Sequence, residues 1–135
     1  MSNRLDLALA VLNGAVGDYL ARTGNGLATD MTWVRGGRPC ALDRAGLARE
    51  LPAARPRLAV LVHGLMCTEA IWRAPDGSDY GSRLDRDFGF EPLHLRYNTG
   101  LALADNGARL ADLLEALVEA YPVPVEEILL LGYSM

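Results

Sequence analysis

The sequence closes with Ile128-Leu129-Leu130-Leu131-Gly132-Tyr133-Ser134-Met135, and this stretch decides the fold. Residues 128–131 form an uninterrupted apolar run, which is typical of a strand buried on both faces of a parallel sheet. The last four residues then match the first four positions of Gly-x-Ser-x-Gly, in which a serine sits on a sharp turn between a strand and a helix. The stretch therefore predicts a buried strand that presents Ser134 at its carboxyl end.

Composition excludes several classes of function. The chain has 135 residues, half of them hydrophobic, which is enough for one domain with a sizeable core. The net charge of −4 gives no basic face for nucleic acid. Every basic residue is arginine, so a lysine-dependent mechanism is excluded. Cys40 and Cys67 lack metal-ligand spacing, and we expect a reduced cytoplasmic protein with no metal.

Residues 5–20 predict an amphipathic helix. Asp6 and Asp18 interrupt the segment, which is too short and too polar to span a bilayer. Apolar residues recur in it at helical spacing: Leu5, Ala8, Leu9, Leu12, Ala15, Val16, Tyr19 and Leu20. We expect this stripe to pack on its own domain or a partner, and docking on a membrane surface is the alternative.

The remainder of residues 1–56 predicts an N-terminal appendage. Short strand-like pieces at 31–34 and 39–42 flank Arg35-Gly36-Gly37-Arg38, and Gly-Gly between two such pieces indicates a hairpin. Asp43 is placed to cap a short helix that ends near Leu51. Residues 52–56 then form a linker, so the core begins at residue 57.

Residues 57–135 alternate strand and helix patterns. Apolar runs predict strands at 58–62, 92–97 and 128–131. Between them we expect a helix at 80–88, closed by Gly89, and a helix at 105–121 with Asp105 or Asn106 as its cap. This alternation indicates an α/β fold, with a mostly parallel sheet and right-handed crossover helices.

A second motif sharpens the interpretation of Ser134. The apolar run 58–62 ends in His63-Gly64-Leu65-Met66. Ester hydrolysis builds negative charge on the carbonyl oxygen, which two converging backbone N–H groups stabilise. Met135, directly after the serine, offers one N–H group, and Leu65 or Met66 offers the other.

With both motifs, the chain resembles the α/β-hydrolase superfamily, and most of all its lipase-like branch, which includes inositol-deacylase and triacylglycerol-lipase relatives. Residues 60–65, 95–100 and 130–135 carry the resemblance, which covers residues 57–135. It implies the N-terminal half of an α/β-hydrolase fold. It also implies that Ser134 attacks carboxylic esters of small molecules or lipids through an acyl-enzyme, without a cofactor. The motif residues under the resemblance are His63, Gly64, Gly132 and Tyr133.

The catalytic acid and histidine present a departure from this pattern. In that superfamily they follow the nucleophile, whereas here only Met135 does. His63 and His94 are expected to be structural rather than bases for Ser134. We therefore expect the N-terminal piece of a longer hydrolase, inactive by itself and prone to associate through its open sheet edge.

Two other classes of function compete with a hydrolase. A non-catalytic module of this fold would bind a partner through the open edge and the N-terminal helix. A nucleotide-binding domain is disfavoured, because no strand is followed by Gly-x-Gly-x-x-Gly or a P-loop.

Several further residues have both a structural and a functional interpretation. Asn98 and Thr99 follow a strand at the end where α/β sheets bind ligands, so either a turn or a substrate contact is expected. Cys67 is expected to be a buried small hydrophobe rather than a reactive thiol. The acidic and arginine residues between 76 and 87 indicate a solvated helix face rather than a metal site.

Overall fold

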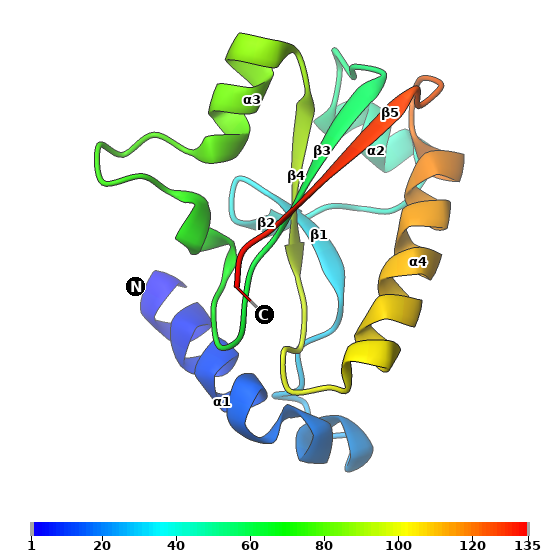
Figure 1. Cartoon of the computed structure of the whole chain (residues 1–135). Coiled ribbons are helices and arrows are strands. Elements are labelled where there is room, and N and C mark those ends of the chain that lie inside the picture. Colours follow the sequence, from blue (N-terminus) through cyan, green and yellow to red (C-terminus); the bar gives the residue numbers. More distant parts are fainter. Residues whose placement is uncertain (1, 135) are drawn as a thin grey trace.

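The computed structural model of the chain describes residues 2–134 and contains helices and a five-stranded sheet (Figure 1). The elements in chain order are α1 (Ser2–Arg22), β1 (Thr32–Arg35), β2 (Arg38–Pro39), α2 (Arg44–Glu50), β3 (Arg57–Val62), the 3₁₀ helix η1 (Glu69–Trp72), α3 (Tyr80–Phe88), β4 (Glu91–Arg96), α4 (Leu103–Ala120) and β5 (Glu127–Gly132). The predicted α/β class is confirmed.

The sheet is mixed rather than mostly parallel. Its strand order is β2-β1-β4-β3-β5. The three strands predicted in residues 57–135 are parallel, with Leu61 opposite His94 on one side and opposite Leu131 on the other. The antiparallel pairs involve β1, which pairs with both β2 and β4. The predicted hairpin is confirmed, because Gly36 and Gly37 have φ values of 57° and 79°, as a two-residue hairpin turn requires.

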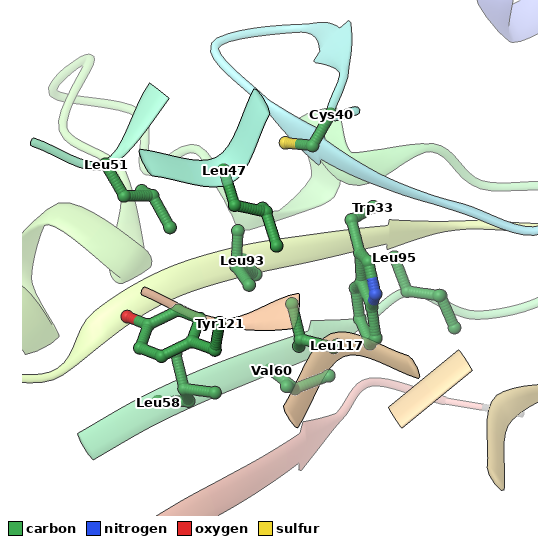
Figure 2. Packing of buried hydrophobic residues seen from close by; sticks show 10 residues of the cluster. All are labelled: Trp33, Cys40, Leu47, Leu51, Leu58, Val60, Leu93, Leu95, Leu117 and Tyr121. Carbon is green, nitrogen blue, oxygen red and sulfur yellow. The ribbon is translucent and has the colours of Figure 1, made fainter. Parts of the chain in front are cut away.

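Two core clusters cover the two faces of the sheet. Leu58 and Val60 point to one face, whereas Ala59 and Leu61 point to the other, as the two-residue period of a strand dictates. On the first face, strand side chains pack against α2 and α4, as Figure 2 shows for Trp33, Cys40, Leu47, Leu51, Leu58, Val60, Leu93, Leu95, Leu117 and Tyr121. The second face is covered by η1 and α3 through Trp72 and Leu84.

The first 56 residues share this sheet and this core with the rest of the chain. Trp33 of β1 is 1% exposed and faces Leu95 in the strand register. Leu47 of α2 is fully buried in the same cluster. The predicted cap is confirmed, since the Asp43 carboxylate accepts the Gly46 N–H at 2.7 Å.

α1 crosses beneath the carboxyl ends of the parallel strands (Figure 1). The helix is confirmed, and the predicted apolar stripe is buried only in part: Leu20 is buried, whereas Leu5, Val16 and Tyr19 are exposed. The buried side also carries Asn13 and Gly17. Two corrections apply elsewhere. First, α4 begins at Leu103 behind Ala102, which makes no side-chain cap bond, so neither Asp105 nor Asn106 is the cap. Second, β5 lies at an edge of the sheet, and its Leu130 is 55% exposed.

No helix within residues 2–134 has both the length and the apolar character needed to cross a membrane.

Candidate functional site at the carboxyl edge of the sheet

The sheet brings the two sequence motifs together. Because β3 and β5 are parallel neighbours with Val62 opposite Gly132, the residues that follow the two strands leave the sheet side by side. The Tyr133 N–H donates to the Val62 carbonyl at 3.0 Å, which extends this pairing one residue past β5. β4 and β5 lie on opposite sides of β3, and the helices that precede them, α3 and α4, pack on opposite faces of the sheet. The strand order therefore changes direction between β3 and β5. Open α/β sheets bind ligands at such a point.

Ser134 adopts a backbone conformation that suits a strand-to-helix turn. Its φ is 57°, in the left-handed region that residues with a Cβ rarely enter. Its side chain is exposed, and no hydrogen bond holds its hydroxyl within residues 2–134. Strained backbone at an exposed nucleophilic residue is typical of functional sites.

The loop after β3 contains two of the three candidate oxyanion donors, and only one of these two N–H groups already has a hydrogen-bond acceptor within residues 2–134. Met66 has a φ of 57°, and its N–H donates to the Thr99 hydroxyl at 3.1 Å. The Leu65 N–H has no acceptor within residues 2–134. Leu65 is therefore the donor left available on this loop. The third candidate, Met135, lies outside the described residues.

His63 holds the peptide group that carries the Leu65 N–H. Its Nδ1 is 3.0 Å from the Gly64 carbonyl oxygen, which can only accept, so Nδ1 bears the proton. The same carbonyl accepts the Cys67 N–H at 3.2 Å. Because the Gly64 carbonyl and the Leu65 N–H belong to one planar peptide, these two bonds fix the direction of the N–H.

The His63 ring is buried and neutral. It is 2% exposed and stacks on Tyr97, with 4.7 Å between ring centroids. The Tyr97 hydroxyl donates to the His63 carbonyl at 2.7 Å. Burial lowers the pKa of His63 below its ordinary value.

Neither histidine is hydrogen-bonded to the Ser134 hydroxyl within residues 2–134. His94 lies in β4 beside α3, with Nε2 3.5 Å from the Asp79 carboxylate, and burial lowers its pKa. Asp79 in turn caps α3. Both histidines thus have structural surroundings, and the described residues bring no base to Ser134.

Asn98 and Thr99 contact α1 and the loop after β3. Asn98 is 2% exposed; its amide donates to the Gly17 carbonyl at 2.9 Å and accepts the Gly100 N–H at 3.0 Å. Asn106 donates to the Asn98 carbonyl at 3.0 Å.

Sequence reasoning missed the matching residues of α1, namely Asn13, Gly14 and Gly17. The available signal was the pair of glycines inside a helix, which usually has a packing reason.

A cavity of about 230 Å³ lies between α1, the segment 26–29 and the strand ends. His63, half-buried Cys67 and Arg96 are among its lining residues. Arg96 pairs with Glu69, and that contact lowers the pKa of the Glu69 carboxyl, although burial opposes it. Within residues 2–134 no three metal-ligating side chains gather. The acidic residues between 76 and 87 instead form ion pairs, such as Asp76 with Arg83 at 2.8 Å.

Comparison with known proteins found no matching family model, no matching curated protein and no matching solved structure. Functional assignment therefore rests on the geometry of the site.

Proposed function

We propose that this chain carries the nucleophile and the oxyanion loop of a serine hydrolase that acts on carboxylic esters of small molecules or lipids. The fold would be the N-terminal half of an α/β-hydrolase, and Ser134 would form the acyl-enzyme. The observation that carries the proposal is the register of β3 and β5, which sets Ser134 beside the loop containing Leu65.

The backbone at each of the two motifs supports this role. Ser134 has the left-handed φ of a strained turn after a strand, which is the setting of the nucleophile in Gly-x-Ser-x-Gly. On the loop that follows β3, the Leu65 N–H has no acceptor within residues 2–134, and the bonds at Gly64 restrain its direction. A fixed, unused donor beside a nucleophile is what stabilises a developing oxyanion.

In this proposal the general base comes from outside residues 2–134, because neither His63 nor His94, whose rings are largely buried, is hydrogen-bonded to the Ser134 hydroxyl. Without a base a serine hydroxyl is almost wholly protonated at neutral pH and attacks slowly. The protein to assay is therefore the full-length product of the gene that contains these residues.

The test is a Ser134→Ala variant of that full-length protein. We expect wild-type protein to hydrolyse p-nitrophenyl butyrate and to react covalently with a fluorophosphonate at Ser134, located by peptide mass spectrometry. Ser134→Ala should remove the adduct and lower kcat by about 10⁴-fold or more.

Ser82→Ala is the matched control, because Ser82 is an exposed serine on α3 with no side-chain hydrogen bond within residues 2–134. It should keep both the adduct and the turnover. Turnover that survives Ser134→Ala, or an adduct on another residue, would contradict the proposal.

One observation favours a second candidate, a partner-binding module without catalysis. β5 pairs only with β3 among the described strands. Beside its free edge lies an open groove of about 440 Å³, lined by Leu114, Glu115, Val118, Glu119 and Ile128. Association through this edge, together with no labelling of Ser134, would favour the module.

A further inference from the structure

The loop after β3 is held by a hydroxyl from the neighbouring strand end. The Met66 N–H donates to the Thr99 Oγ1 at 3.1 Å. Met66 has a φ of 57°, a conformation that a residue with a Cβ keeps only when its surroundings impose it. The Thr99 hydroxyl is the one acceptor that this N–H has within residues 2–134.

Thr99 is itself held in place by its contact with α1. A Cβ built on Gly14 would lie 2.3 Å from the Met66 Cγ and 3.1 Å from the Thr99 Oγ1, so α1 touches both partners of the bond. One turn further, Gly17 receives the Asn98 side chain. Gly100 lies so close to the α1 backbone that a Cβ added to it would be 2.1 Å from the Asn13 carbonyl oxygen.

The bond has a consequence for the choice of oxyanion donor. Two candidate N–H groups follow one another on this loop, in successive peptide planes that meet at the Leu65 Cα, and only the Met66 N–H has an acceptor within residues 2–134. While Thr99 accepts from Met66, the Leu65 peptide is set by the bonds on either side of it. Loss of the Thr99 hydroxyl leaves the Met66 N–H without an acceptor and removes the restraint on that side of Leu65, so that only the bonds at the Gly64 carbonyl still hold the Leu65 peptide.

We propose that Thr99 is a positioning residue of the oxyanion site: its hydroxyl, held against α1, engages the Met66 N–H and so keeps the Leu65 N–H aimed at the reacting carbonyl. This inference rests on the proposed function and adds a role that neither strand motif assigns. In this proposal Thr99 acts through the Met66 N–H, so we expect its effect to be on the transition state rather than on substrate binding.

The experiment compares Thr99→Val, which keeps the shape and removes the acceptor, with Thr99→Ser, which keeps the acceptor. Both are made in the full-length protein and assayed with p-nitrophenyl butyrate. An alkylboronic acid serves as transition-state analogue, because its boron bonds to the serine Oγ and becomes a tetrahedral anion. Thr23→Val is the matched control, since the Thr23 hydroxyl, just after α1, bonds only to carbonyls of the end of that helix within residues 2–134.

We expect Thr99→Val to lower kcat by about 10- to 100-fold and to weaken boronate inhibition by a similar factor, with KM nearly unchanged. Thr99→Ser should restore both quantities to within about threefold of wild type, and Thr23→Val should change neither. If Thr99→Val folds poorly, the ratio of kcat between Thr99→Ala and Thr99→Ser, at equal folded fraction, gives the same answer.

Wild-type kcat in Thr99→Val, equal losses in the valine and serine variants, or a rise in KM alone would overturn the inference. These outcomes are separable from failure of the proposed function. A protein that is silenced by Ser134→Ala and unaffected by Thr99→Val keeps its nucleophile and loses only the role given to Thr99.

Discussion

Single residues at this site are defined by what surrounds them more than by their chemical type. His63 and His94 have the same chemical side chain but different surroundings. The His63 ring stacks on Tyr97, whereas the His94 ring lies beside Asp79, the residue that caps α3. In both, burial lowers the pKa, since the charged imidazolium loses its hydration.

These shifts predict how stability depends on pH. A histidine whose pKa is lower in the folded state binds fewer protons there than in the unfolded chain, so stability falls as pH falls below about 6.5. Each histidine contributes at most about 1.4 kcal/mol per pH unit. We expect His63→Asn to flatten this slope between pH 7 and pH 5, measured by urea denaturation at each pH. Burial raises the pKa of Glu91, which makes stability rise as pH falls. This contribution is the same in wild type and in His63→Asn, so it does not affect the comparison.

An equal slope in wild type and His63→Asn would show that the imidazole is not kept neutral by folding. Asparagine is the suitable replacement because its side-chain amide can still donate to the Gly64 carbonyl.

Residue roles at the site were predictable only where a local pattern encodes them. The position of Ser134 after a strand follows from residues 128–134 alone. The bond from Met66 to Thr99 joins residues 33 positions apart, and no local pattern specifies it. Only the structure therefore shows that the Met66 N–H already has an acceptor, whereas the Leu65 N–H has none within residues 2–134.

At the scale of elements, boundaries followed from caps and spacing where these were local. α3 has the predicted bounds, because Asp79 accepts N–H groups of its first turn and Gly89 closes it with a φ of 72°. α1 shows the opposite case. Its bulky apolar residues predicted the buried side, but the loop at 98–100 approaches too closely for them, and glycines take that place.

Two glycine substitutions separate the effect of tertiary contact from the local helix propensity of the residue. Gly14→Ala would set a Cβ 2.3 Å from the Met66 Cγ and should displace α1 or the loop, destabilising the fold by about 1–3 kcal/mol. Gly107→Ala, also within a helix, meets no atom within 4 Å and should stabilise α4 by about 0.5–1 kcal/mol. Chemical denaturation of both variants measures the difference.

Opposite signs for the two variants are expected, since an added Cβ meets other residues at Gly14 and none at Gly107. A neutral or stabilising Gly14→Ala would mean that α1 does not sit against Met66 as the structure has it.

At the scale of the whole molecule, the position of β5 decides how the protein meets others. The continuous apolar run at 128–131 correctly predicted a strand, but not its burial, since such runs are typical of strands with both faces covered and Leu130 is exposed. It could not give the number of neighbouring strands, which depends on sheet order. In the described residues β5 has β3 on one side only, so the backbone groups of its other edge are unpaired.

That edge predicts self-association. Leu130 of β5 is 55% exposed, and Val118 of α4, which lines the groove together with Ile128 of β5, is 44% exposed, so apolar surface adjoins unpaired strand groups. An edge of this kind pairs readily with another strand, and an added charge discourages such pairing. We expect Leu130→Lys to shift the population toward monomer in sedimentation velocity runs across a concentration series. The cost in stability should be small, at most about 1 kcal/mol, because the side chain is already half in water.

Leu103→Lys is the matched control, since Leu103 is 74% exposed at the start of α4 and lies outside β5 and the groove beside it. It adds the same charge and removes a similar exposed area, but it should leave association unchanged. If both variants dissociate the protein equally, the effect is one of net charge. If neither does, association, where it occurs, does not use β5. Loss of association in Leu130→Lys alone assigns the contact to the free edge, because only there does the new ammonium group meet a strand.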